Sequence, residues 1–203
     1  MKIHTYVLGE MQANCYLLEN EGKAIIIDPA DDANFLFEEL QRKRLKLVAL
    51  FATHGHFDHI MAVGEIQMSI NVPLYIHKKD QFLIDRLENT AEHFLGHKQI
   101  IVSPHNFEYV STETLHVTRF AFDVIETPGH TPGGVCYSFP SEKIIFTGDT
   151  LFAGAVGRTD FSYSNKNELL TSLKTILSFP EETTIYPGHG ELSFIGQEKR
   201  ILG

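Results

Sequence analysis

The chain has 203 residues, a length that suits one domain, and its formal net charge of −9 opposes binding to the phosphates of nucleic acid. Its apolar runs are far shorter than the ~20 residues that span a bilayer, and the two cysteines, Cys15 and Cys136, lack the spacing of a disulfide framework. We therefore expect a single domain over residues 1–203, a cytoplasmic location and a small-molecule substrate, with neither nucleic acid nor membrane as a partner.

The first half of the chain predicts strands that soon begin to alternate with helices. Alternating or short apolar runs predict three strands, the last two joined by a turn at Glu19–Gly22. They cover Lys2–Val7, Ala13–Leu18 and Lys23–Ile27. Asp31 or Asp32 is expected to cap a helix that reaches about Arg44. The pattern then predicts a strand, a helix, a strand and a helical surface segment, over Lys46–Thr53, Ile60–Ile70, Pro73–Ile76 and Lys78–Gly96.

The second half repeats this outline, with more strands and a later helix. The expected strands are Asn106–Val110, Thr114–Val117, Phe122–Thr127, Val135–Phe139, Lys143–Thr147 and Thr183–Tyr186, and the helix is Asn167–Leu177. Two successive sheets, each with helices on one outer side, predict an α/β fold in the form of a four-layer αββα sandwich.

Four possible metal ligands stand within six residues, immediately after the strand that ends at Thr53. They are His54, His56, Asp58 and His59. Imidazole nitrogens and carboxylate oxygens suit zinc, iron or manganese, and Gly55 allows the chain to turn so that alternate side chains face different ions. The segment alone therefore offers parts of two metal sites.

Three more candidates also follow predicted strands, and each comes directly after a glycine. They are His130, Asp149 and His189. Any one histidine taken alone is more simply a structural or surface residue, but seven candidates in the same context predict a metal centre. The other histidines lack this context and are expected to be structural or exposed: His4, His77, His93, His97, His105 and His116.

This set of residues resembles the metallo-β-lactamase superfamily, whose members carry a His-x-His-x-Asp-His segment followed by a His, an Asp and a His. The chain looks most like the short relatives of the glyoxalase II branch. The resemblance implies the αββα fold and two ions, with Asp149 bridging between a first and a second ligand group. The first group is His54, His56 and His130, and the second is Asp58, His59 and His189. It also implies that Asp28 supports the ligands, although an ordinary Asp-Pro turn explains Asp28 as well.

For the chemistry, the resemblance implies a hydrolase that uses a metal-bound hydroxide on a small thioester, such as S-lactoylglutathione, or on a related ester. Asp58 would be the catalytic carboxylate that orients the hydroxide. The ions would be zinc in the simplest case, with iron or manganese also fitting the ligands. A covalent route has no support, because the sequence has no Gly-x-Ser-x-Gly elbow and no evident Cys-His pair.

The substrate is less well defined than the metal centre. The family's His-Glu-Tyr segment is replaced by His189-Gly190-Glu191, and no counterpart of the helical extension that holds glutathione follows. Arg158, which stands where the family has a Lys, is predicted to bind an anionic substrate group through its guanidinium fork, with Phe152 beside it and Tyr163 a weaker candidate. The alternative is a structural pair between Arg158 and Asp160.

One rival has a different chemistry. Gly157–Phe161 reads Gly-Arg-Thr-Asp-Phe, which resembles persulfide dioxygenases of the same superfamily. Such an oxidoreductase would hold a single iron through His56, His130 and Asp149, but its Ala-His-Asp-Tyr segment is absent. An interaction module that keeps all seven ligands without catalysis is a third reading.

Overall fold

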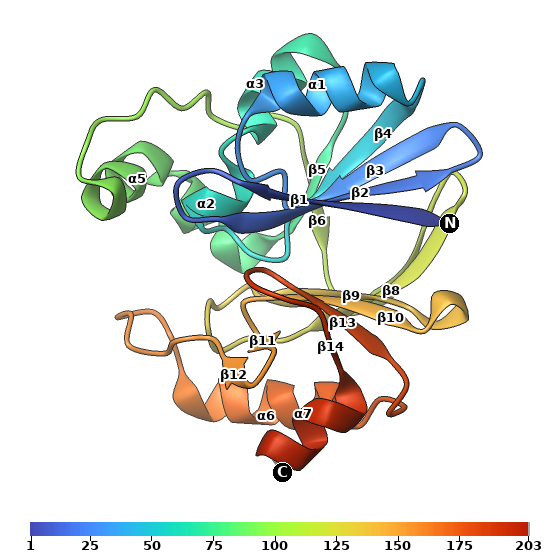
Figure 1. The fold of residues 1–203 in the computed structure, drawn as a ribbon. Helices are drawn as coiled ribbons and strands as arrows, with labels where there is room; N and C mark the ends of the chain where they lie inside the picture. The colour runs from blue at the N-terminus through green and yellow to red at the C-terminus, as the bar shows by residue number, and fades with distance from the viewer. Residues whose placement is uncertain (203) are drawn as a thin grey trace.

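Two six-stranded sheets face each other at the centre of the molecule, and helices cover the outer face of each sheet (Figure 1). The structure is a computed structural model that describes residues 1–202, so the last position of the predicted domain, residue 203, lies outside it. Across residues 1–202, no helix has the length and apolar character needed to cross a membrane.

The first sheet begins antiparallel and continues parallel. Its strands, in spatial order, are β1 (Lys2–Leu8), β2 (Ala13–Asn20), β3 (Lys23–Ile27), β4 (Lys46–Phe51), β5 (Leu74–His77) and β6 (Phe107–Val110). The pairs β1–β2 and β2–β3 are antiparallel, and β3, β4, β5 and β6 run parallel. The mainly apolar β3 and β4 lie inside this sheet, as expected for strands covered on both faces.

The second sheet is mainly antiparallel. Its strands, in spatial order, are β14 (Ser193–Phe194), β13 (Thr184–Pro187), β10 (Ile144–Gly148), β9 (Val135–Phe139), β8 (Phe120–Glu126) and β7 (Glu113–Val117). Both β8 and β10 are antiparallel to β9, while β13 is parallel to β10. It follows that β8, β10 and β13 all point the same way and that their carboxyl ends share one edge of the sheet. A two-stranded ribbon of β11 (Leu151–Phe152) and β12 (Ala155–Val156) follows β10.

The helices fall into two groups, one packed on each sheet. On the first sheet are α1 (Ala33–Arg42), α2 (Phe57–Ile60), α3 (Val63–Ser69), a 3-10 turn (Lys78–Asp80), α4 (Gln81–Ile84) and α5 (Leu87–Leu95). On the second are α6 (Lys166–Ile176) and α7 (Ile195–Leu202), with a second 3-10 turn at Pro140–Glu142. Asp32 caps α1 by accepting a hydrogen bond from the Phe35 amide at 3.0 Å, which confirms one of the two predicted caps.

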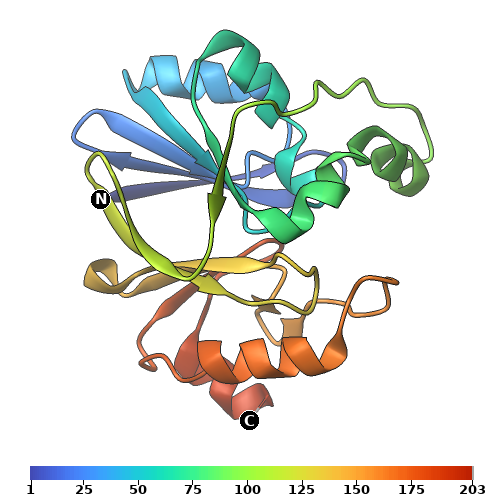
Figure 2. The same ribbon diagram turned by 180° about the vertical axis from the view of Figure 1, so that it is seen from behind.

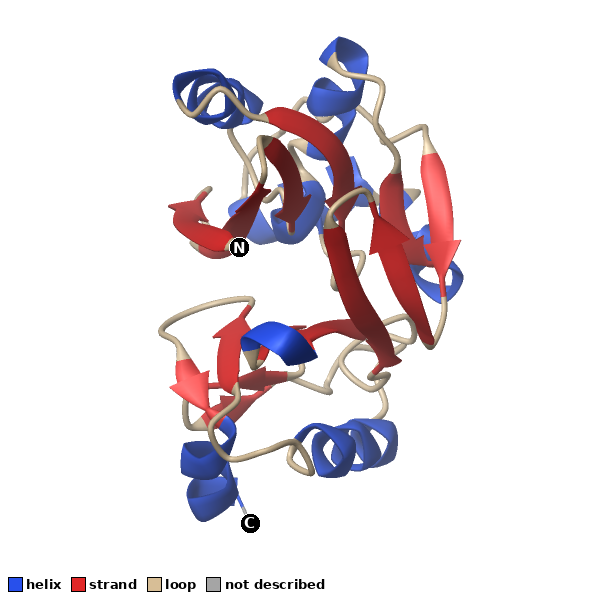
Figure 3. Ribbon diagram, turned by 90° about the vertical axis from the view of Figure 1, so that its right-hand side faces the viewer, coloured by secondary structure: helices blue, strands red, loops and turns tan. Residues whose placement is uncertain are grey.

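Three apolar clusters separate the four layers. The central cluster joins inward-facing residues of both sheets, among them Phe51 of β4 and Phe122 of β8, whose rings meet edge to face with centroids 5.2 Å apart. A second cluster packs the first sheet against its helices, and a third packs the second sheet against α6 and α7. Figure 3 shows the resulting order of helix, sheet, sheet and helix edge-on. The predicted αββα sandwich is confirmed.

Several local predictions were wrong at element boundaries. The single helix expected over Ile60–Ile70 is two helices, because α2 starts earlier, at Phe57, and the chain bends where the Ala62 amide bonds to the Pro29 carbonyl at 3.2 Å. The helical segment expected over Lys78–Gly96 is likewise broken into a 3-10 turn, α4 and α5. The β11–β12 ribbon, β14 and α7 were not predicted, since each is short and its pattern is weak in the sequence.

Candidate metal centre

The dense His and Asp segment leaves the end of β4 and leads directly into α2. His56 takes an extended backbone conformation and begins the helix, so that Asp58 and His59 project from its first turn rather than from the loop expected from the sequence. The imidazoles of His54, His56 and His59 are all buried. The extended His56 followed by the short helix α2 thus directs the side chains of His54, His56, Asp58 and His59 toward one cluster.

The other three candidates arrive from the second sheet. His130, Asp149 and His189 follow β8, β10 and β13, whose carboxyl ends share an edge. The glycines before them allow close approach as well as turning. A Cβ on Gly188 would lie 2.2 Å from Asp149 Oδ1, and one on Gly148, where φ is +48°, would lie 2.2 Å from Thr53 Oγ1. No larger residue fits at either position without displacing the cluster.

The first group of imidazoles converges tightly. His54 Nε2 and His130 Nε2 each lie 3.0 Å from His56 Nδ1, so three ring nitrogens face one point. The structure therefore brings together the three residues that the resemblance assigned to one ion, and they form a group able to hold a metal.

The second group lies beside the first. Asp58 Oδ2 is 3.3 Å from His189 Nε2 and 3.7 Å from His59 Nε2. Asp149 stands between the groups, because its Oδ2 is 3.5 Å from His130 Nε2 whereas its Oδ1 is 3.4 Å from His59 Nε2. One carboxylate thus faces both sets of imidazoles, which is the placement that a bridging ligand requires.

Outer hydrogen bonds determine which nitrogen of each imidazole faces the cluster. The Nδ1–H groups of His130 and His189 donate to the carbonyls of Arg158 and Gln12, at 2.9 and 3.2 Å. His59 Nδ1 donates to Asp28 Oδ2 at 3.1 Å. In each ring the Nε2 lone pair is then free to face inward, as in metal-binding histidines whose other nitrogen is held by a carbonyl or carboxylate.

The remaining two imidazoles also have one nitrogen held by an outer hydrogen bond. His54 uses Nδ1 for this bond, as the other rings do, whereas His56 uses Nε2. Thr53 Oγ1 donates to Asp28 Oδ2 at 2.8 Å and therefore accepts from His54 Nδ1 at 3.0 Å. His56 instead directs Nδ1 inward, while its Nε2 bonds to the hydroxyl of Tyr163 at 2.8 Å. Five ring nitrogens and two carboxylates thus point to a common space.

The inner atoms also show that protein groups alone do not complete the cluster. Within residues 1–202, the buried side-chain atoms that have no hydrogen-bond partner are His59 Nε2 and Asp149 Oδ1. An unpaired buried polar atom is costly, and two at one point call for an explanation. Divalent cations would satisfy both atoms, so the donor set fits metal ions.

The cluster's electrostatics favour neutral imidazoles in the first group and charged groups in the second. Burial, reinforced by the surrounding imidazoles, lowers the pKa of His54 well below its usual range, and burial lowers the pKa of His56 to about 3. Burial opposes the charge of His59, but the carboxylates of Asp58 and Asp149 outweigh it and raise the pKa of His59 to about 10. Asp58 is held ionised, because His59 and His189 lower its pKa despite burial. Bound cations would take over this compensation of the carboxylate charge.

Asp28 supports the ligands as the resemblance implied. Its carboxylate accepts from the Thr53 amide at 2.7 Å, as well as from Thr53 Oγ1 and His59 Nδ1. Asp28 has φ of +51°, an unfavourable conformation for a residue other than glycine, which is the kind of backbone strain found at functional sites. A plain turn would not need a fully buried carboxylate with three donors.

Two further supporting residues were missed by sequence reasoning. Asp80, fully buried after β5, accepts from the amides of Gly55 and Gly133 at 2.9 and 2.6 Å and from Thr131 Oγ1 at 2.8 Å, which ties the His54–His56 segment to the turn after His130. Its position just beyond a strand end was the available signal. Asn14, a lone buried amide in the apolar strand β2, gave no signal of its role.

Asn14 fastens the loop that carries His189. Its Nδ2 donates to the carbonyls of Pro187 and Gly190, each at 3.0 Å, on either side of the histidine. The backbone N–H of Asn14 also donates to the Gly188 carbonyl at 2.8 Å. The first sheet thereby positions a candidate ligand that belongs to the second.

A cleft of about 120 Å³, partly open to solvent, adjoins the cluster. Arg158 lines it, and its guanidinium is paired in a fork with Asp160, with both N–O distances 2.6 Å, so the structural alternative is present. Phe152 packs beside His189, with ring centroids 6.3 Å apart, and is not among the residues that line this cleft. Tyr163 holds His56 rather than the cleft wall.

The fold and the arrangement of the candidate ligands together define a metal-binding α/β sandwich. Comparison with known proteins identifies its family. Residues 8–189 match the model of the metallo-beta-lactamase superfamily. The chain belongs to this superfamily.

Three similar proteins indicate where the chain lies within it. It is 34% identical to hydroxyacylglutathione hydrolase GloC of Haemophilus influenzae, over 98% of this chain and 96% of that protein. The crystal structure of BLEG-1 B3 metallo-beta-lactamase superposes with a TM-score of 0.92 and 35% identity, covering 100% of both chains. That of TTHA1623 in a di-iron-bound form gives a TM-score of 0.90 and 34% identity, covering 98% of both. Metal-dependent hydrolysis is the activity class that these likenesses support.

Proposed function

We propose that the protein is a dinuclear metal-dependent hydrolase that cleaves a small thioester, such as S-lactoylglutathione, or a related ester. In this proposal His54, His56 and His130 hold one ion, and Asp58, His59 and His189 hold the other. Asp149 bridges the two ions. Zinc is the simplest occupant, and the likeness to a protein with a di-iron form keeps iron as a direct competitor.

The observation that carries the proposal is the position of Asp149. Its two oxygens face different ligand groups, and one of them is among the buried atoms without a partner. A single ion in the first group would leave Asp149 Oδ1 and His59 Nε2 unsatisfied. Two ions satisfy both atoms, so the dinuclear arrangement explains the whole cluster.

The chain's own residues set up hydrolysis at the open side of the cluster. Two ions, when bound, supply the Lewis acidity that activates water and polarises the scissile carbonyl. Asp58 is in the cleft lining, next to His189, where its carboxylate orients the attacking water by accepting a hydrogen bond. Asp28, Asp80 and Asn14 keep the ligands in place, so that little reorganisation is needed during turnover.

The test is steady-state hydrolysis of S-lactoylglutathione by protein loaded separately with zinc, iron and manganese. We expect kcat/KM of about 10⁴ M⁻¹s⁻¹ or more in at least one metal form. Asp58→Ala should lose that activity together with part of its bound metal. Asp85→Ala is the matched control, because Asp85 is an exposed aspartate of the same chain, outside the cleft lining, whose carboxylate accepts a hydrogen bond from Gln81. No turnover in any metal form would reject the glutathione thioester as substrate.

The persulfide dioxygenase is the second candidate, supported by Gly157–Phe161 and by a cleft at the same edge of the sheets. It needs three ligands and one iron, whereas His189, Asp58 and His59 here form a further group able to hold a metal. Oxygen consumption with glutathione persulfide by the iron form decides between them. The hydrolase predicts no persulfide-dependent oxygen uptake, and uptake that is lost in His56→Ala but kept in His189→Ala would favour the dioxygenase.

The predictions about surroundings fit the same proposal. Both cysteines are buried and free, which supports a reducing compartment such as the cytoplasm. The net charge of −9 supports a small-molecule substrate over nucleic acid. These two points stay predictions.

A further inference from the structure

Part of the cleft lining is apolar. Met11 in the β1–β2 turn, Phe57 of α2, Phe94 of α5 and Phe161 after β12 all line it. Figures 1 and 2 show the β1–β2 turn, α5 and the chain after β12 projecting on the same side of the molecule. Met11 and Phe94 are each 41% exposed, so part of the apolar lining is open to solvent.

The aromatic side chains form a connected surface that reaches the ligands. Phe94 stacks on Phe57 with centroids 6.0 Å apart and meets Phe161 edge to face at 6.2 Å. Phe161 in turn lies 5.3 Å from the ring of His56 and 6.0 Å from that of His130. An apolar group bound on this surface would therefore be adjacent to the carbonyl held at the metal ligands.

The one Lys or Arg side chain in the cleft lining is already engaged. Arg158 forms a two-bond fork with Asp160 and lies over the ring of Phe161, with its guanidinium carbon 4.5 Å from the ring centroid. The side chain thus holds Phe161 in the wall by a cation–π contact, and its charge is balanced by a carboxylate. Among the described residues of this lining, no Lys or Arg side chain is left without a carboxylate partner.

We propose that the cleft selects an uncharged, apolar acyl group, of the size of a short branched chain or a phenyl ring, through Phe94, Phe161 and Met11. This inference rests on the proposed function and specifies its substrate class. It departs from the sequence prediction that Arg158 recognises an anionic group. Arg158 instead becomes a positioning residue for the aromatic wall.

The test compares two thioesters of one thiol, N-acetylcysteamine, with 3-phenylpropanoyl or lactoyl as the acyl group. Sharing the thiol removes the leaving group from the comparison. We expect kcat/KM to favour the phenylpropanoyl thioester by about tenfold, since a few apolar carbons in a fitting pocket contribute that much. Phe94→Ala should abolish most of this preference. Calorimetric titration of the zinc-loaded protein with the uncharged 3-phenylpropanamide and lactamide measures the same selectivity without turnover.

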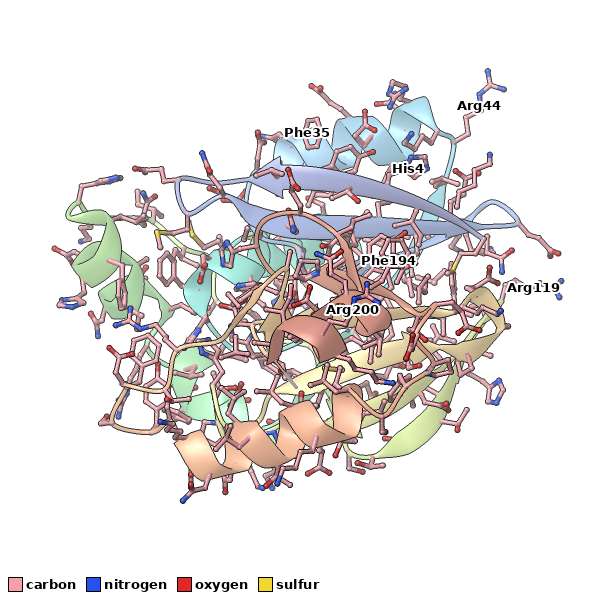
Figure 4. All side chains as sticks on the ribbon, turned by 60° about the horizontal axis from the view of Figure 1, so that its bottom comes forward. His4, Phe35, Arg44, Arg119, Phe194 and Arg200 are labelled. Carbon is pink, nitrogen blue, oxygen red and sulfur yellow. The ribbon has the colours of Figure 1, made fainter. Side chains whose placement is uncertain are left out.

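Phe194→Ala is the matched control. Phe194, labelled in Figure 4, lies on β14 in the other half of the sandwich from α5 and is 50% exposed, so it loses the same side chain outside the cleft. The control should keep the full preference. Equal or stronger use of the lactoyl thioester, or a preference that survives Phe94→Ala, overturns the inference while leaving the hydrolase in place. If neither thioester is hydrolysed, the proposed function fails, and the calorimetric selectivity and its response to Phe94→Ala alone decide the inference.

The role of Arg158 has its own readout. Asp160→Asn frees the guanidinium from its partner. If Arg158 only positions Phe161, the KM for a succinyl thioester of the same thiol should fall by less than about twofold. A much larger fall in that KM would show that Asp160 suppresses an anion site, contrary to the proposal.

Discussion

Replacing Asn14 with alanine isolates the contribution of the first sheet to the position of His189. The substitution removes two hydrogen bonds, to the carbonyls of Pro187 and Gly190, and leaves the backbone bond to Gly188 in place. The Pro187 carbonyl keeps a second donor, Tyr16 Oη at 2.5 Å, and Gly190 is exposed to water. The loop should therefore remain folded but less firmly held.

The magnitudes follow from what is lost. Two neutral hydrogen bonds contribute about 0.5–1.5 kcal/mol each, so we expect a loss of about 2 kcal/mol in the free energy of unfolding. Loss of an outer partner of a ligand typically weakens metal binding by about 10–100-fold. That loss should fall on the ion held by His189, while the ion held by the first group is little affected.

Metal titration against a competing chelator, with elemental analysis of the dialysed protein, measures both affinities, and urea unfolding measures stability. Asn20→Ala is the matched control, because Asn20 also lies on β2 and donates one bond, at 2.9 Å, to the Arg119 carbonyl away from the centre. A variant that loses stability but binds two ions as tightly as the parent would refute the positioning argument and leave Asn14 with a structural role alone.

Three other outcomes can be checked with the same equipment. Asp80 accepts hydrogen bonds from three buried donors, the Gly55 and Gly133 amides and Thr131 Oγ1. Asp80→Asn keeps the side-chain shape but places an NH2 group against one of these donors. The affinity for the ion held by His54, His56 and His130 should therefore fall about 10–100-fold in the same metal titration. Arg42 and Tyr6 lower the pKa of Glu39 to about 2. Glu39 therefore stabilises the folded chain above pH 4.5, and the difference in urea midpoint between the parent and Glu39→Gln should shrink as pH falls from 4.5 toward 2. Finally, chelation of the bound ions should lower Tm by about 10 °C in a thermal scan.

The clustering of the candidate ligands could be predicted from the sequence because their signals are local. Each candidate follows a strand, and the histidines and aspartates at strand ends stand out from the apolar runs before them. The glycines at 129, 148 and 188 mark the same positions, and the structure shows that two of them, Gly148 and Gly188, are needed for close packing against the cluster. The pattern could also predict two sheets, since strand runs and helices alternate through both halves.

The supporting residues could not be predicted in the same way, because their partners are distant in the chain. Asn14 acts on carbonyls 173 and 176 residues away, and Asp80 joins segments 25 and 53 residues away. For Arg158, prediction was limited for a different reason. Its partner, Asp160, is two residues away, but nothing local distinguishes a guanidinium that is paired with it from one that is free for substrate.

The expected effect of chelation follows from where the ligands originate. Asp58 and His59 belong to the first half of the sandwich and His189 to the second, so an ion held by all three joins the two halves. Without ions, His59 Nε2 and Asp149 Oδ1 remain buried without a hydrogen-bond partner among the described residues, which costs stability. At a metal concentration about 30 times each Kd, each of the two ions adds about 2 kcal/mol, or about 4 kcal/mol together, which corresponds to a shift in Tm of about 10 °C for a chain of this size. His189→Ala should retain only the part of that shift contributed by the first ion, and a full shift in this variant would contradict the two-ion centre.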